Sequence, residues 1–293
     1  MNKWVAGARP RTLPAAVVPV VVGTAAAVGE AAGGIVWWRA AAALVVALGV
    51  QVGTNYANDY SDGVRGTDRP GTRTGPVRLV GSGLAEPATV KRAALLGFLV
   101  AAVAGLTLAV GVDPWLLAVG AASFAAGWLY TGGPKPYGYL GLGEVFVFVF
   151  FGLVATVFST YVQTETILAL AVGVGAAVGF LATALLVANN LRDIPSDTSA
   201  GKKTLAVRRG DARTRQLYLT LLACAFATIV ALATRLDRWS MLLALAALPL
   251  AVRPVRTVAG GAVGPALVPV LADTGRLQLA AGLALAAGLA LSG

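Results

Sequence analysis

Long apolar stretches recur along almost the whole chain, and they constrain its fold more than any other feature of the sequence. We count nine, at residues 13–29, 36–58, 93–111, 114–131, 143–161, 166–190, 216–234, 239–252 and 277–291. A helix needs about 20 apolar residues to cross the hydrocarbon core of a bilayer. Only 12% of the 293 residues are charged, whereas soluble domains average about 25%. The sequence therefore predicts an all-α, polytopic membrane protein with about nine transmembrane helices around a central cavity.

Two regions leave the topology open. The last two stretches are short, and an apolar segment rich in glycine and proline, 258–273, lies between them. Because glycine and proline interrupt regular helices, this segment is interpreted as a re-entrant or interfacial piece, or as part of a span. The first stretch follows three basic residues and resembles a signal peptide. It contains Pro14 and Pro19, and many spans follow it, so we expect a retained helix.

The basic residues are concentrated on one side of the predicted membrane. The N-terminus and the loops 59–92, 132–142, 191–215 and 253–276 hold 20 of the 23 lysines and arginines. Because Lys and Arg are enriched in cytoplasmic loops, we expect these loops and the N-terminus to face the cytoplasm. The net charge of +10 then reflects membrane topology, and no nucleic-acid partner is predicted.

Two classes of site are excluded by composition. The chain has no histidine, so it contains no Ser-His-Asp triad and no His-ligated zinc site. Its one cysteine, Cys224, lies in an apolar stretch and has no second cysteine to pair with.

A first acidic motif follows the stretch 36–58. Asn58 and Asp62 are four residues apart, so they share one face of a helix. Asp68 lies six residues further on, past Gly63 and Gly66, and a loop there is expected to fold it back toward the helix end.

A second acidic motif follows the stretch 166–190. Asn189, Asp193 and Asp197 are spaced four residues apart. Proline disrupts helix interiors, so we expect Pro195 to loosen the helix and to leave Asp197 on an irregular turn. The two motifs lie four spans apart, which indicates a weak internal repeat. Residues 1–293 are therefore interpreted as a single domain of two weakly repeated four-helix units plus a C-terminal helix.

The paired motifs suit a metal-bound diphosphate. Mg²⁺ prefers oxygen ligands and is commonly held by one or two carboxylates plus substrate phosphates. Two facing carboxylate clusters can hold Mg²⁺ ions that bridge a diphosphate, and nearby cations neutralise the remaining charge. The candidate cations are Arg65, Arg69, Arg73, Arg78, Arg192, Lys202 and Lys203. The alternative is that these acids are solvated or form salt bridges with the arginines; two clusters at equivalent points of a repeat favour a site.

A loop between the fourth and fifth stretches is a third candidate element. It is rich in glycine and proline and contains Tyr130, Lys135 and Tyr139, and Glu144 stands where the next helix begins. An acid is favourable at a helix start, so a plain turn explains this segment about as well as a direct role in the site.

These motifs resemble those of the UbiA superfamily of intramembrane prenyltransferases over nearly the whole chain. The resemblance includes Arg-Pro-Arg-Thr-Leu-Pro at 9–14, Tyr-Thr-Gly-Gly-Pro at 130–134, Gly-Leu-Gly-Glu at 141–144 and both acidic motifs. Arg9 and Arg11 either face the same pocket or only orient the chain. The superfamily pattern is Asn-x3-Asp-x3-Asp; Gly66 replaces the third acid of the first motif, and the resemblance implies that Asp68 substitutes for it.

Within the superfamily, segments at 57–62, 66–68, 75–80, 189–193 and 271–277 resemble the menaquinone-pathway branch. This implies transfer of a polyprenyl group from polyprenyl diphosphate to 1,4-dihydroxy-2-naphthoate, with loss of CO₂ and diphosphate, at the cell membrane of a bacterium. The implied Mg²⁺ ligands and catalytic residues are Asn58, Asp62, Asp68, Asp193 and Asp197. The implied substrate-binding residues are Arg65, Arg73, Arg78, Tyr130, Lys135, Tyr139, Asn189, Asn190, Arg192 and Lys202. The alternatives are another aromatic acceptor or a small-solute transporter.

Overall fold

The computed structural model describes residues 2–68 and 78–293. The helices of these residues are α1 (Lys3–Ala8), α2 (Pro14–Ala26), α3 (Trp37–Val64), α4 (Pro87–Gly111), α5 (Leu116–Leu129), α6 (Gly143–Val147), α7 (Ala155–Thr164), α8 (Ala169–Ser199), α9 (Leu205–Arg235), α10 (Leu248–Ala259) and α11 (Val268–Leu291). The 3-10 helices are η1 (Pro10–Thr12), η2 (Tyr137–Leu140), η4 (Trp239–Ala247) and η5 (Gly264–Leu267), and a π-helix, η3 (Phe148–Val154), joins α6 to α7.

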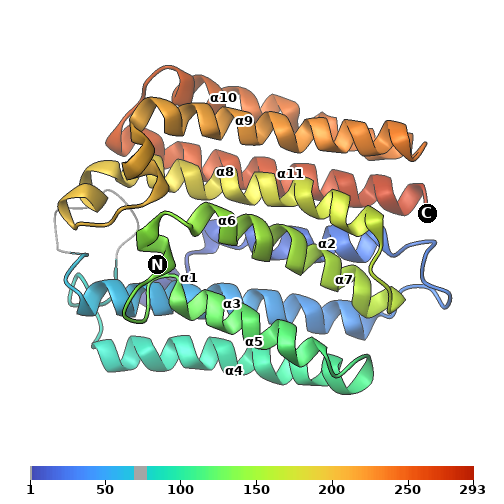
Figure 1. Ribbon diagram of the computed structural model, residues 1–293, viewed down its shortest axis with the longest axis horizontal. Coiled ribbons are helices and arrows are strands. Elements are labelled where there is room, and N and C mark those ends of the chain that lie inside the picture. The colour runs from blue at the N-terminus through green and yellow to red at the C-terminus, as the bar shows by residue number, and fades with distance from the viewer. Residues whose placement is uncertain (1, 69–77) are drawn as a thin grey trace.

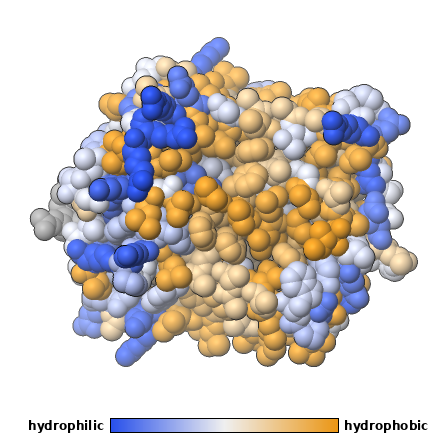
Figure 2. All heavy atoms as spheres, viewed as in Figure 1, coloured by the Kyte–Doolittle hydropathy of each residue, from blue (hydrophilic) through white to orange (hydrophobic). Residues whose placement is uncertain are grey.

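The long helices lie side by side along one direction, as a membrane bundle requires (Figure 1). Among the described residues, seven helical rods are long and apolar enough to cross a membrane, and α2 and α5 are shorter apolar helices. Figure 2 shows an apolar band between polar ends on the face in view. The all-α, multi-pass membrane fold is thus confirmed. The number nine stays a prediction, because α2 has 13 residues and α5 has 14.

Glycines allow the helices to approach each other closely. A Cβ atom added at Gly49 on α3 would lie 2.8 Å from the carbonyl oxygen of Gly97 on α4. A Cβ atom at Gly152 on η3 would lie only 2.4 Å from the Cα atom of Gly179 on α8. Such small-residue contacts are typical of packed membrane helices, since lipid supplies no hydrophobic force between them.

The second acidic motif is helical throughout, so the prediction of an irregular turn at Asp197 is wrong. Helix α8 continues through Pro195 and ends only at Ser199. Proline removes a single N–H donor, and here it stands in the final turns, where few helical bonds depend on it. Asp193 and Asp197 therefore lie one turn apart on the same helix.

The C-terminal span begins earlier than the sequence predicts. The segment 258–273 is not re-entrant: α10 ends at Ala259, η5 makes one turn, and α11 runs from Val268. Asp273 and Gln278 lower the apolar character of its first turns, and both are buried in the bundle. Apolar runs alone miss these turns because their polar side chains face other helices rather than lipid.

Chain connections that are distant in sequence meet at one end of the bundle. Figure 1 shows the N-terminus, the α5–α6 connection and the α8–α9 connection at this end, with the C-terminus at the other. Helices α3 and α8 also finish here, and each carries one acidic motif in its last turns. We call this the polar end of the bundle.

Candidate active site

The first motif occupies the last turns of α3 and faces a large cavity. Asn58 and Asp62 are both buried, and both line the cavity, as their four-residue spacing predicts. Asn58 Oδ1 accepts a hydrogen bond of 2.7 Å from Thr131 Oγ1. Asp62 accepts one of 2.5 Å from the Tyr139 hydroxyl and a second of 2.9 Å from Lys202 Nζ. The α5–α6 connection and the α8–α9 connection thus both contact this motif.

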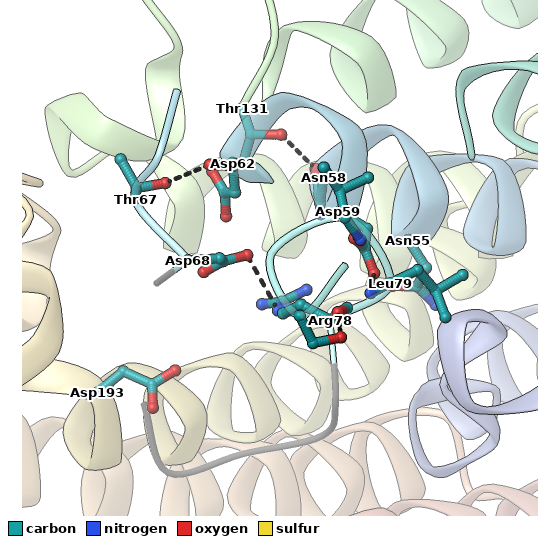
Figure 3. Close-up of polar contacts among 12 residues, drawn as sticks. Asn55, Asn58, Asp59, Asp62, Thr67, Asp68, Arg78, Leu79, Thr131 and Asp193 are labelled. Carbon is teal, nitrogen blue, oxygen red and sulfur yellow. Dashed lines mark hydrogen bonds and ion pairs between the residues drawn. The ribbon is translucent and has the colours of Figure 1, made fainter. Parts of the chain in front are cut away.

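Asp59 has a structural role that the sequence analysis missed. Its carboxylate is fully buried and accepts hydrogen bonds from the backbone N–H groups of Leu79, at 2.9 Å, and Val80, at 3.0 Å. A carboxylate that accepts backbone N–H groups anchors the segment that carries them. Asp59 therefore holds the chain beside Arg78, whose Nε atom lies 3.3 Å from Asp68 Oδ2 (Figure 3). The signal available in the sequence was an acid between Asn58 and Asp62 on the opposite helix face.

The second motif is held by charge-assisted hydrogen bonds within α8. Arg192 Nε donates to Asp193 Oδ1 at 2.7 Å, and another nitrogen of the same guanidinium donates to Asp193 Oδ2 at 2.8 Å. Arg192 also donates to Asn189 Oδ1 at 2.7 Å. Asn190 Nδ2 donates to Glu144 Oε1 at 2.9 Å, which ties α8 to the start of α6. These fork-like contacts fix the side chains in direction as well as in position.

The α5–α6 connection lies against the first motif. Arg65 donates to the carbonyl oxygens of Thr131 and Gly133. The ring of Tyr139 lies between two cations, with Lys202 Nζ 4.7 Å and Arg65 Cζ 5.6 Å from its centroid. Burial raises the pKa of the Tyr139 phenol above its usual value, and the charge of Asp62 raises it further. Tyr139 therefore remains a protonated donor to Asp62.

The cavity has a volume of about 910 Å³ and extends from the two motifs into the bundle. Its polar end includes Asn58, Asp62, Arg78, Tyr130, Tyr139, Asn189, Asn190, Arg192, Asp197 and Lys202. Much of the rest is apolar, with contributions from α2, α3, α5 and the α6–η3–α7 rod. The cavity is therefore amphipathic, with charged groups at one end and hydrocarbon side chains beyond them.

Four of the described candidates lie outside the lining of this cavity: Arg65, Asp68, Lys135 and Asp193. Lys135 is exposed, whereas Asp68 and Asp193 are buried behind Arg78 and Arg192, which do line it. Figure 3 shows Asp62, Asp68 and Asp193 in the same region, contributed by α3, the segment after it and α8. Arg69 and Arg73 fall outside the described residues.

The donor atoms fit a magnesium ion that arrives with a diphosphate. Within the part of the chain that the structure describes, no three acidic residues form a ready metal cage. Mg²⁺ usually takes only one or two carboxylates and completes its shell with phosphate oxygens and water. Asn58, Asp62 and Asp197 present amide and carboxylate oxygens around one cavity, which is this kind of incomplete set.

Comparison with characterised proteins supports the sequence resemblance. The profile of the UbiA prenyltransferase family matches residues 16–259. The 1,4-dihydroxy-2-naphthoate octaprenyltransferase of Mycobacterium tuberculosis is 53% identical over 98% of this chain and 97% of its own length. The protein of the same name from Escherichia coli is 36% identical over 99% of this chain and 95% of its own.

Solved structures share the fold at low identity. A UbiA homolog from Aeropyrum pernix has a TM-score of 0.69 at 14% identity and covers 96% of each chain. A UbiA homolog from Archaeoglobus fulgidus, solved bound to GPP and Mg²⁺, has a TM-score of 0.61 at 15% identity and covers 98% of this chain and 100% of its own.

Proposed function

The chain belongs to the UbiA prenyltransferase family, and we propose on this premise that it transfers a polyprenyl group from polyprenyl diphosphate to 1,4-dihydroxy-2-naphthoate. CO₂ and diphosphate leave, and the product is demethylmenaquinone. Relatives of the same length carry the name of this reaction at 51% and 53% identity. Family membership also favours prenyl transfer over solute transport.

One structural observation supports the proposal above the others: the cavity is charged at one end and apolar beyond. A polyprenyl diphosphate has the same division between an anionic head and a hydrocarbon tail. Its head matches the end that holds Asp62, Arg78, Arg192 and Lys202. Its tail matches the apolar wall, since hydrocarbon is stabilised by leaving water.

The cations at the polar end would bind and orient the diphosphate. Arg78, Arg192 and Lys202 line the cavity, and each is held by an acid of the motifs, Asp68, Asp193 and Asp62 respectively. We propose that Asn58, Asp62 and Asp197, with Asp68 and Asp193 behind them, hold Mg²⁺. When bound, the metal supplies charge that stabilises the departing diphosphate.

Aromatic rings follow the polar end and would surround the reacting carbon. Tyr130 and Tyr137 have centroids 5.4 Å apart, Tyr137 stacks on Phe146 at 3.9 Å, and Phe146 on Phe150 at 5.9 Å. All four residues line the cavity. Their π faces attract positive charge that develops as the allylic C–O bond breaks. The same rings exclude water, which would otherwise capture that carbon.

The apolar helices and the bacterial relatives support placement in a bacterial cell membrane. We propose that the polar end faces the cytoplasm, because most of the basic side chains in the loops lie at this end. Residues 1–293 then form one prenyltransferase domain, and the four-helix repeat remains part of this proposal.

Product analysis with an acceptor panel tests the proposed function. The purified protein in lipid vesicles would receive one polyprenyl diphosphate, Mg²⁺, and either 1,4-dihydroxy-2-naphthoate, 4-hydroxybenzoate or homogentisate. We expect a prenylated product from the naphthoate alone. A product from another acceptor at a higher rate would retain the family and reject this acceptor, and no product from any of them would reject the function.

A further inference from the structure

A stripe of amide and acid side chains extends from the first motif toward the middle of the membrane. Gln51, Asn55, Asn58 and Asp62 follow a four-three-four spacing on α3, and all four line the cavity. At 1.5 Å per residue, Gln51 lies about 16 Å along the helix from Asp62. It is therefore the deepest polar group of this stripe, well away from the charged end.

The hydrogen bonds around Gln51 determine which way its amide points. Thr12 Oγ1 donates to Arg9 O at 2.9 Å, so its hydroxyl hydrogen is already used. It can therefore only accept from its other neighbours, which are Gln51 Nε2 at 3.0 Å and Asn55 Nδ2 at 3.2 Å. Asn55 Nδ2 also donates to Ala8 O at 2.9 Å, which orients that amide as well. A flipped Gln51 amide would direct its oxygen at an acceptor, so the nitrogen must face Thr12.

The Gln51 oxygen consequently faces the cavity. Within the part of the chain that the structure describes, no group donates to Gln51 Oε1, and this atom is not enclosed by protein. Gln278 on α11 provides the contrast: it is 0% exposed and both of its amide atoms are enclosed. Gln51 keeps 7% of its surface, and it lines the cavity. An amide oxygen in an apolar wall favours a ligand that donates a hydrogen bond to it.

We propose that Gln51 Oε1 accepts a hydrogen bond from the aromatic acceptor and so selects a hydroxylated ring. This inference rests on the proposed function. A carboxylate cannot donate, so the carboxylate of 1,4-dihydroxy-2-naphthoate would face the cationic end. The C1 hydroxyl is adjacent to that carboxylate, whereas the C4 hydroxyl lies across the ring from it. The C4 hydroxyl is therefore the group that reaches Gln51, and the hydrogen bond orients the ring for attack on the donor.

The test compares two ligands that differ only in this hydroxyl, 1,4-dihydroxy-2-naphthoate and 1-hydroxy-2-naphthoate. The KM of the first and the inhibition constant of the second would be measured for the wild type and for Gln51→Met, which preserves side-chain length. A net hydrogen bond of ordinary strength corresponds to a factor of roughly five to ten. We expect the KM to rise by about that factor and the inhibition constant to stay within twofold.

Gln163→Met is the matched control. Gln163 is a buried amide on α7 that accepts from Val36 N at 2.8 Å and does not line the cavity. Both constants should stay within twofold of the wild type in this variant.

Equal changes for both ligands in Gln51→Met, or no change for either, would overturn the proposal. If Gln51→Met does not fold, Thr12→Val makes the same comparison, because it removes the acceptor that orients the amide; it should raise the KM selectively, and unselective or absent effects would overturn the proposal. Turnover of the naphthoate by the wild type tests the proposed function separately.

Discussion

Lys202 Nζ lies 2.9 Å from Asp62 Oδ2, so the connection that follows the second acidic motif contacts the first motif directly. The two residues are 140 positions apart. Lys202 also accounts for part of the polar environment of Tyr139, whose ring it faces at 4.7 Å. One side chain therefore joins α3, the α5–α6 connection and the α8–α9 connection at the end of the cavity.

Replacement of Lys202 by methionine should affect both binding and stability. Breaking a buried pair leaves an uncompensated charge and costs roughly 3–5 kcal/mol. We expect Lys202→Met to raise the KM for the polyprenyl diphosphate by at least tenfold and to lower the melting temperature. Lys203→Met is the matched control, because Lys203 is exposed and only its backbone N–H contacts Tyr139 O. Similar behaviour of the two variants would contradict the role of Lys202.

Asp59→Asn should destabilise the segment beside Arg78. An asparagine can accept through one oxygen only, so one of the N–H groups of Leu79 and Val80 loses its acceptor, at a cost of about 1–3 kcal/mol. We expect a lower melting temperature and a higher KM for the diphosphate, with the KM for the naphthoate unchanged. Asp237→Asn, at an exposed position, is the control. An unchanged melting temperature would argue against an anchoring role.

Gly152→Ala tests the contact between η3 and α8. The added Cβ would lie 2.4 Å from Gly179 Cα and 2.8 Å from Gly175 O, both backbone atoms that cannot move independently. Overpacking of this kind typically costs about 1–3 kcal/mol. Thermal melting of the purified protein should show the loss. Gly33→Ala, where nothing lies within 4 Å of the added Cβ, should melt as the wild type does, and equal melting of both variants would refute the close contact.

Tyr139→Phe removes a hydrogen bond to Asp62 without removing the ring. The pKa of Tyr139 is raised above 10.0, chiefly by burial and then by Asp62. The phenol is therefore protonated below pH 10, and its contribution is lost only as the pH rises through the raised pKa. Hydrogen bonds to charged groups contribute about 1.5–3 kcal/mol, so kcat/KM should fall by at least tenfold. The factor should be equal at pH 6.5 and pH 9; a smaller factor at pH 9 would show that Tyr139 ionises earlier.

The sequence predicted the parts of the site that depend on helical periodicity. Asn58 and Asp62 line the cavity together because four residues make about one turn. Asp197 also lines it, although the expected disruption at Pro195 does not occur. Arg78, Arg192 and Lys202 were predicted from their charge and their position after the motifs, and each pairs with an acid there.

Other features depend on contacts that no single stretch of sequence encodes. Asp59 anchors a segment 20 residues away, and Gln51 is oriented by Thr12, which precedes it by 39 residues. The π-helix η3 lies in a continuous apolar stretch, and its packing against α8 is set by glycines on both helices. Tertiary packing, rather than local preference, determines these three features.

The central claim is that the acidic, cation-lined end of the cavity supports decarboxylative prenylation of the naphthoate. The most direct measurement supplies carboxyl-labelled 1,4-dihydroxy-2-naphthoate and a polyprenyl diphosphate to the purified protein in vesicles and follows labelled CO₂, diphosphate and demethylmenaquinone together. We expect the three products in equal amounts with Mg²⁺, none after chelation by EDTA, and none from Asp62→Ala or Asp193→Ala. Prenylated product that retains the label, or full activity in either variant, would contradict the claim.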